Sequence, residues 1–405
     1  MDHKVKDWKQ NFLILWTGQA VSIFTSSVIQ MAIIWYLTDT TGSAAILTFA
    51  TLMGFLPQAA LSPFVGVLID RYNRKTVMIV SDLFIAASLL VLVIAGFFGE
   101  LPIWLIMLVL FVRSIGATFH TPSLKAITPL IVPKEHLIRF AGYSQTFQSV
   151  SLLFSPAVAA VLYSVWELNM IFLIDIAGAI FAIITLSLVT VRPLMNKKVS
   201  QRPNVVSEAK EGFNVLRSEQ GMMALLFISA VYAMIYFPIG TLYPLITMTY
   251  FGGAVMHSSL IEILSSLGAL IGAIALGKWG DRINKMGAIK TSIACMGLGL
   301  IATGLLPPEG IKIFFILSFL MGITLPFYHG VLNSIYQIMF SEKYLGRIFS
   351  LTSGITKIAM PLGLILTGAF AEIIGVEKWF LISGLFTVAI ALACSMLPSL
   401  RNCCK

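Results

Sequence analysis

The chain has 405 residues, of which 58% are hydrophobic and only 11% are charged. A soluble globular domain carries about 25% charged residues, so this composition excludes an ordinary water-soluble protein. The net charge of +9 would suit nucleic acid binding, but the basic residues follow a pattern typical of membrane proteins. We therefore expect the lipid bilayer, and not nucleic acid, as a partner of the chain.

Twelve apolar stretches follow one another, each close to the ~20 residues that cross the hydrocarbon core as a helix. Backbone groups in lipid must be hydrogen-bonded internally, which favours helices, and the sequence lacks the alternating ten-residue segments of a membrane barrel. An all-α membrane protein is therefore predicted. The twelve predicted transmembrane helices cover residues 11–37, 45–69, 76–98, 102–122, 138–164, 168–191, 221–248, 257–279, 288–306, 311–335, 346–371 and 378–397.

Basic residues alternate with these helices. With an inside N-terminus, only Lys312 and Lys378 of the 27 Lys and Arg residues fall in outer loops, and only Arg113 and Lys357 lie within helices. The other 23 face the cytoplasm, which is the positive-inside pattern, so both termini are expected there. Tryptophans near helix ends are expected as interfacial anchors. These are Trp8 and Trp279 at the inner side and Trp35, Trp104, Trp166 and Trp379 at the outer side.

A short basic loop occurs twice, about half the chain length apart. Its copies, Gly66–Lys75 and Gly277–Lys285, each place Gly four residues before an Asp-Arg pair, with Asn and a cation just after. Duplication in a membrane protein indicates two pseudo-symmetric halves that move against each other. The alternative is that the cations only hold the loop inside. We predict a gating motif made of Gly66, Asp70, Arg71, Arg74, Gly277, Asp281 and Arg282.

The longest polar stretch, residues 192–220, separates an N-terminal half, 1–191, from a C-terminal half, 221–405. Its second part has apolar residues at helical spacing and charges elsewhere, which predicts an amphipathic helix on the inner membrane surface. This cytoplasmic linker would tie the halves together while letting them rock. A simple tether is the alternative.

The duplicated loop and five segments of the first half carry a family resemblance. The five segments are Trp16–Ser22, Gln30–Ile34, Arg113–Pro122, Ala141–Gln145 and Tyr163–Asn169. The loop resembles the signature of the major facilitator superfamily, whose fold has twelve transmembrane helices in two pseudo-symmetric six-helix bundles. Within it, the segments resemble the bacterial macrolide-efflux (Mef-type) drug:proton antiporters.

This resemblance implies a secondary active exporter of amphipathic drugs, namely macrolide antibiotics, that works by proton antiport with alternating access. It also implies a monomer in the bacterial cytoplasmic membrane, and it makes a separate ATP-binding resistance protein a candidate partner. The alternatives are export of a siderophore or metabolite, uptake by symport, and a receptor or scaffold that binds without transport. The sequence lacks a phosphate-binding loop, metal-ligand spacing and a nucleophile–base motif, so neither an enzyme nor a cofactor or metal is expected.

Ionisable side chains inside membrane helices are costly, which makes them functional candidates. Burial raises the pKa of a carboxylate and a nearby cation lowers it, so a change of conformation can load and release a proton. Each such residue also has a structural alternative, a hydrogen bond between helices, and this is the preferred interpretation of Asp82, Asp175, His120 and His329. The candidates for proton coupling are Arg113, Asp82, Asp175, Glu262 and Lys357.

The resemblance implies that helices 1, 4, 7 and 10 line a central cavity. Aromatic and neutral amide side chains there suit a bulky amphipathic ligand, with helix packing as the alternative. Two features depart from the pattern of drug antiporters: Ser155–Ala160 replaces a Gly-Pro-x-x-Gly-Gly motif, and the first helix has no central carboxylate. The predicted cavity residues are Gln19, Gln30, Trp35, Gln145, Gln148, Tyr232, Tyr236, Asn333 and Tyr336. Tyr243 and Tyr328 are further aromatic residues of the predicted cavity helices.

Overall fold

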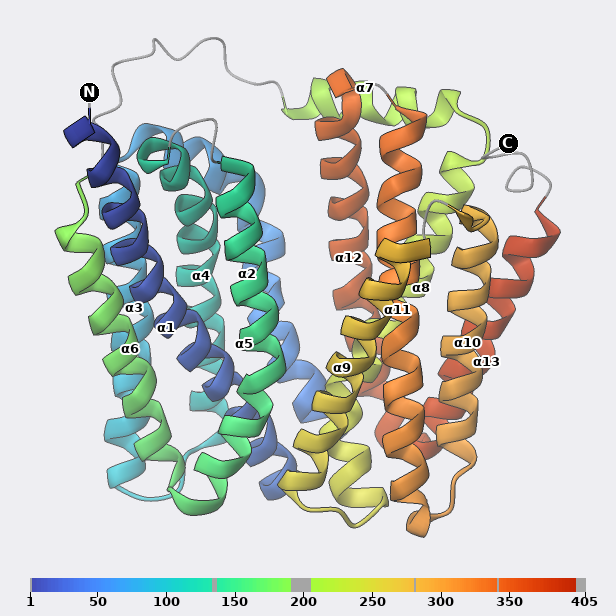
Figure 1. Ribbon diagram of the computed structural model, residues 1–405. Coiled ribbons are helices and arrows are strands. Elements are labelled where there is room, and N and C mark those ends of the chain that lie inside the picture. Colours follow the sequence, from blue (N-terminus) through green and yellow to red (C-terminus); the bar gives the residue numbers. More distant parts are fainter. Residues whose placement is uncertain (1, 133–136, 191–204, 280–281, 341, 398–405) are drawn as a thin grey trace. The chain divides into compact units, whose positions relative to one another are not determined.

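The computed structural model describes residues 2–132, 137–190, 205–279, 282–340 and 342–397 (Figure 1). These residues are almost entirely helical and contain no strand, which confirms the all-α prediction. Within them, eleven helices are long and apolar enough to cross a membrane, and a further helix has a shorter apolar segment, Leu153–Val165. The first half comprises α1 (Asp2–Thr41), α2 (Ala44–Arg71), α3 (Arg74–Phe97), α4 (Ile103–Ile131), α5 (Leu137–Val165) and α6 (Leu168–Leu188).

The remaining helices begin with α7 (Val205–Ser218), which covers the segment where the amphipathic helix is predicted and packs against α8 and α12. Pro361 lies inside α12, as Pro156 lies inside α5. The other elements are α8 (Met222–Leu245) with its π-helical continuation η2 (Ile246–Tyr250), α9 (Val255–Trp279), α10 (Lys285–Leu305), η4 (Pro308–Gly310), α11 (Ile311–Met339), α12 (Glu342–Ile374) and α13 (Val376–Met396).

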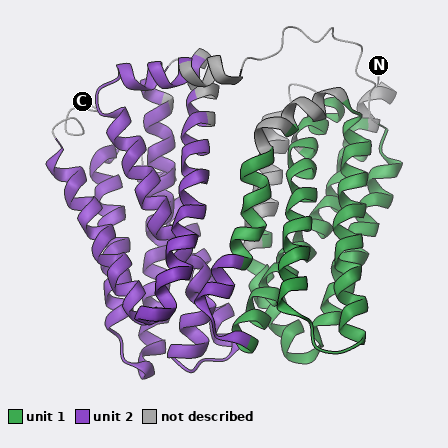
Figure 2. Ribbon diagram, turned by 180° about the vertical axis from the view of Figure 1, so that it is seen from behind, with its two compact units in different colours: residues 1–40, 50–198 green, residues 41–49, 199–405 purple. Residues whose placement is uncertain are grey.

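The chain forms two compact units (Figure 2). Unit 1 contains residues 1–40 and 50–198, and unit 2 contains residues 41–49 and 199–405. The segment 41–49 joins unit 2 through α12, where Ser43 Oγ donates a hydrogen bond of 2.7 Å to Glu372 Oε2. The sequence does not indicate that residues 41–49, which include the first turn of α2, pack with unit 2.

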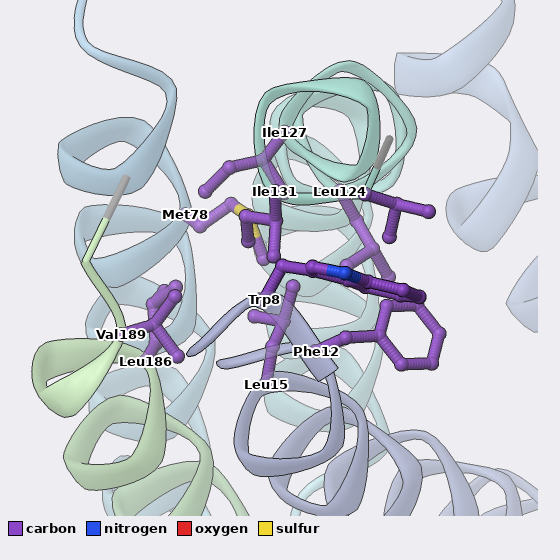
Figure 3. Packing of buried hydrophobic residues seen from close by; sticks show 10 residues of the cluster. Trp8, Phe12, Leu15, Met78, Leu124, Ile127, Ile131, Leu186 and Val189 are labelled. Atoms are coloured by element: carbon purple, nitrogen blue, oxygen red, sulfur yellow. The ribbon is translucent and has the colours of Figure 1, made fainter. Parts of the chain in front are cut away.

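One end of unit 1 is filled by an apolar cluster in which α1, α3, α4 and α6 meet (Figure 3). Trp8 is only 6% exposed and packs in this cluster, so the prediction that it anchors the chain at the membrane interface is wrong. Trp35 is also fully buried, whereas Trp104, Trp166 and Trp279 are exposed as anchors should be. We call this group the inner cluster, after the side of the membrane that the basic loops predict for this end; it consists of Trp8, Phe12, Leu15, Met78, Leu124, Ile127, Ile131, Val132, Leu186 and Val189.

In unit 2, α9 and α11 approach each other closely through glycines. A Cβ atom on Gly268 would overlap the carbonyl oxygen of Phe319, and one on Gly322 would overlap that of Ser265. Gly272, one turn after Gly268, meets the backbone of Ile323 in the same way. Glycines four residues apart commonly let membrane helices pack backbone to backbone. The backbones of α9 and α11 are therefore in direct contact.

The asparagines of the duplicated loop cap two helices. Asn73 accepts a hydrogen bond of 3.0 Å from the backbone N–H of Lys75, and Asn284 accepts one of 2.9 Å from Gly287. Their backbone angles are nearly the same, φ −66° and ψ 114° for Asn73 against φ −67° and ψ 113° for Asn284. The two copies therefore share one local structure as well as one sequence pattern.

Replacing either asparagine with alanine should loosen the start of the helix that it caps. Loss of an N-cap costs about 1 kcal/mol, so we expect Asn73→Ala and Asn284→Ala to speed amide hydrogen exchange in the first turns of α3 and α10 respectively. Asn73→Asp, which can still accept the bond, is the control. Unchanged exchange in both alanine variants would contradict the capping role.

Candidate functional site

The structure describes part of the gating motif. Arg74 is half-buried at the start of α3, whereas Gly277 and Arg282 are exposed. A Cβ atom on Gly277 would meet nothing within 4 Å, so close packing among the described residues does not require this glycine. The described residues do not include Asp281. The surroundings of Gly66 and the side chains of Asp70 and Arg71 are also not described. Gating by the motif stays a prediction.

The neighbouring Lys75 does have a defined role. Its Nζ atom donates hydrogen bonds of 2.8 Å and 2.9 Å to the backbone carbonyls of Ser187 and Val189, at the C-terminal end of α6. A cation stabilises the carbonyl groups that are left unpaired at a helix C-terminus. The first copy of the loop thus fastens the start of α3 to the end of α6.

Among the described residues of unit 1, a polar site is centred on Asp175, which α6 holds at 1% exposure. Arg113 Nη1, from α4, lies 2.8 Å from Asp175 Oδ2. The other carboxylate oxygen accepts hydrogen bonds from two α1 hydroxyls, Thr25 Oγ1 at 2.9 Å and Ser26 Oγ at 2.8 Å. Gly178 lets α1 come this near, because a Cβ atom there would lie 2.5 Å from Thr25 Oγ1. We call these four residues the Asp175 network.

The Asp175 network joins three helices through one carboxylate. Its charges balance, since the guanidinium of Arg113, whose side chain is 11% exposed, faces the buried carboxylate, and charge-assisted bonds are roughly twice as strong as neutral ones. Protonation of Asp175 would remove the partner of Arg113 and weaken the hold of α6 on α1 and α4. Two predicted coupling residues thus form one site, whereas Thr25 and Ser26 were missed. A run of hydroxyl residues inside an apolar helix, Thr25–Ser27, was the available signal.

A second pair of titratable groups lies between α3 and α4. His120 Nε2 is 3.3 Å from Asp82 Oδ1, and the two residues are 9% and 3% exposed. Asp82 is one of the predicted coupling residues, and His120 is the histidine interpreted as structural. Nothing in the sequence indicates that these two residues are in contact.

The other two coupling candidates lie in unit 2. Glu262 is half-buried on α9, and Lys357 is exposed on α12. Neither makes an ion pair with any residue that the structure describes. Their role in coupling stays a prediction.

Three tyrosines form an aromatic group in unit 2. Tyr232 and Tyr236 on α8 stack with ring centroids 5.6 Å apart, and Tyr328 on α11 lies 4.5 Å from Tyr232. Tyr232 and Tyr328 are buried, and Tyr236 is half-buried. Flat, stacked rings with hydroxyl groups can cover apolar surface and donate hydrogen bonds. Two predicted cavity residues, Tyr232 and Tyr236, are therefore brought together.

The remaining cavity candidates are dispersed. Trp35 is packed edge-on against Tyr163 at 6.4 Å, and Tyr336 against Phe349 at 6.0 Å, so both contribute to helix packing. The other placements vary: Gln19 is fully buried, Gln30 is half-buried, Asn333 is exposed, and the side chains of Gln145 and Gln148 lie outside the described residues.

Comparisons with known proteins agree with this architecture. Residues 15–308 and 225–401 match the model of the Major Facilitator Superfamily. The chain is 49% identical over 399 residues to Macrolide efflux protein A of Streptococcus pyogenes, covering 98% of each. It is 49% identical over 323 residues to Macrolide efflux protein A of Enterococcus faecalis, covering 80% of this chain and all of that protein.

Solved transporters share the fold at low sequence identity. The nucleoside transporter NupG matches with a TM-score of 0.74 at 14% identity, covering 95% of this chain and 98% of that one. A bacterial homologue of the iron transporter ferroportin, in an inward-facing state, matches with a TM-score of 0.74 at 15% identity, covering 96% and 99%. This multi-pass membrane protein belongs to the Major Facilitator Superfamily.

Proposed function

We propose that this protein exports macrolide antibiotics across the bacterial cytoplasmic membrane in exchange for protons. The observation that carries the proposal is the 49% identity, over 98% of both chains, with Macrolide efflux protein A of Streptococcus pyogenes. An identity of this extent spans all helices, including those that hold the Asp175 network and the tyrosine group. Both termini would lie in the cytoplasm, where the basic loops are retained.

Transport would use alternating access by two bundles of six membrane helices, with α5 as the twelfth span beside the eleven long apolar helices. The Asp175 network would couple proton binding to movement of α1 and α4, because its carboxylate bonds to both helices. The tyrosine group of α8 and α11 would contribute apolar area and hydroxyl groups to drug binding. The duplicated loops would act as gates at the cytoplasmic side.

Expression in a drug-hypersusceptible bacterial host tests the substrate. We expect the protein to raise the inhibitory concentration of macrolides in this host. Antibiotics that are small and hydrophilic should be unaffected and serve as the control panel. Unchanged susceptibility to every macrolide would overturn the substrate assignment.

Energy coupling needs its own measurement. Cells loaded with labelled macrolide should lose it rapidly when energised, and a protonophore should abolish that loss. Efflux that persists after the proton gradient has collapsed would contradict antiport while leaving the export of macrolides intact.

A further inference from the structure

A second polar layer lies inside unit 1, between the Asp175 network and the inner cluster. Its position follows from a regular stripe on α1, where Trp8, Phe12, Leu15, Gln19, Ser22 and Ser26 alternate at spacings of four and three. Residues at this spacing share one helix face. The stripe begins in the inner cluster with Trp8, Phe12 and Leu15 and reaches the Asp175 network at Ser26.

An equivalent stripe runs the opposite way on α4. It consists of Arg113, Ala117, His120, Leu124, Ile127 and Ile131. Arg113 belongs to the Asp175 network, and the last three residues belong to the inner cluster (Figure 3). The stripes of α1 and α4 therefore meet at both ends, in the Asp175 network at one end and in the inner cluster at the other. Gln19 and His120 are each seven residues from the Asp175 network, or about 10 Å at a rise of 1.5 Å per residue, so they lie at the same level.

Helix α3 places Asp82 at this level too. Asp82 is four residues from Met78, as Gln19 is from Leu15 and His120 is from Leu124, and these apolar residues all belong to the inner cluster. The 3.3 Å between His120 Nε2 and Asp82 Oδ1 confirms that α3 and α4 meet there. We call Gln19, Asp82 and His120 the inner polar layer.

The inner polar layer is buried but not satisfied. Gln19 is 0% exposed, and neither its Oε1 nor its Nε2 atom makes a hydrogen bond with a described residue. The same holds for Asp82 Oδ2 and His120 Nε2. More than about 90% of buried polar groups in proteins are hydrogen-bonded, and each exception needs a reason. In contrast, both carboxylate oxygens of Asp175 are bonded. Among the described residues of unit 1, Asp82 and His120 are thus a carboxylate and an imidazole that each keep a buried atom free to take up a proton.

The other charged side chains considered on these helices have partners elsewhere, are exposed, or lie outside the described residues. On the helices that contact α3, Arg113 and Asp175 neutralise each other, and Lys75 binds carbonyls at the end of α6. On α1, Lys9 is exposed, and on α4 the side chain of Lys125 lies outside the described residues. Among the described side chains, His120 is the basic group that faces Asp82.

From this geometry we propose that Gln19, Asp82 and His120 form a second proton-binding site, which the inner cluster separates from the inner end of unit 1. A proton binds on Asp82 or His120, and the amide of Gln19 can donate to or accept from either one. No bond other than that to the proton forms or breaks. Exchange of the proton at that end requires the inner cluster to part, which links proton release to movement of α1 and α4. The inference rests on the proposed proton antiport.

The test is the pH dependence of drug binding by the purified full-length protein, with the macrolide erythromycin as the probe. If drug displaces one proton, its apparent affinity rises about tenfold per pH unit as long as the free site carries that proton, and becomes independent of pH once the site is deprotonated. We expect Asp82→Asn and His120→Gln to reduce this change to less than about twofold per pH unit. Asp39→Asn and His257→Gln replace an exposed carboxylate and an exposed histidine, and should keep the slope of the unmodified protein.

The outcomes separate this inference from the proposed function. A flat pH profile in the unmodified protein, together with efflux that resists a protonophore, would overturn proton antiport itself. A steep profile that Asp82→Asn and His120→Gln leave unchanged would overturn only the second proton site. If neither variant folds, Asp82→Glu keeps the carboxyl group and should shift the carboxyl band that drug addition changes in the infrared difference spectrum. A band at an unshifted frequency would then exclude Asp82 as the proton carrier.

Discussion

The single substitution Asp175→Asn should abolish export and strongly destabilise unit 1. It leaves the guanidinium of Arg113 buried without its carboxylate partner, and breaking a buried ion pair from one side costs about 3–5 kcal/mol. Thr25 and Ser26 would also exchange a charged acceptor for a neutral one. We expect a lower midpoint of thermal unfolding for purified Asp175→Asn and no drug resistance in cells.

A double variant separates the two effects. Replacing both partners with apolar residues, as in Arg113→Met with Asp175→Leu, removes the uncompensated charge, and such replacements are often neutral for stability. Thr25 can still donate to the backbone carbonyl of Ser22, from which its hydroxyl already lies 3.1 Å. The double variant should therefore unfold close to the temperature of the unmodified protein and yet remain unable to export drug.

The comparison of the three proteins tests both roles of the Asp175 network. Thermal unfolding is measured in one detergent, and transport is measured as efflux of labelled macrolide from cells with equal amounts of protein in the membrane. If the double variant were stable and active, the network would be structural only. If Asp175→Asn were as stable as the unmodified protein, the ion pair would not carry the expected energy.

The sequence allowed much of the fold to be predicted, because a membrane helix needs a long apolar run and interrupting polar loops. Contacts between side chains of different helices could not be predicted from the sequence in the same way. Arg113 and Asp175 were each suspected as costly charges in lipid, but nothing local connects two residues on different helices. Trp8 shows the same limit, since a tryptophan near a helix end looks alike in sequence whether it faces headgroups or the interior of a bundle.

The duplicated loop was predicted as a repeat, but its chemistry was only partly foreseen. The predicted gating motif consists of the glycines and charged residues of the loop, whereas the described geometry assigns clear roles to other polar residues of the loop. Asn73 and Asn284 are at N-cap positions that residue type alone could have suggested. Lys75 could not have been placed, because its acceptors are carbonyls at the end of α6.

The glycine contact between α9 and α11 gives the second large effect. We expect Gly322→Ala to destabilise unit 2, because the added Cβ atom overlaps the carbonyl oxygen of Ser265 and a backbone atom cannot rotate away. Overpacking of this kind typically costs about 1–3 kcal/mol. Gly354→Ala on α12 is the matched control, since a Cβ atom there meets nothing within 4 Å. That variant should be neutral or gain up to about 1 kcal/mol from the better helix propensity of alanine.

For the same chemical change, the thermal unfolding of purified Gly322→Ala should therefore move to a lower temperature, whereas that of Gly354→Ala should stay unchanged or rise. Gly268→Ala, which overlaps the carbonyl oxygen of Phe319 on the same contact, should behave like Gly322→Ala. Once one substitution has forced α9 and α11 apart, the other meets less resistance, so the double variant should lose less stability than the two single losses combined. Full additivity would mean that the helices yield locally at each glycine, and equal stability of Gly322→Ala and Gly354→Ala would show that the close approach is not required.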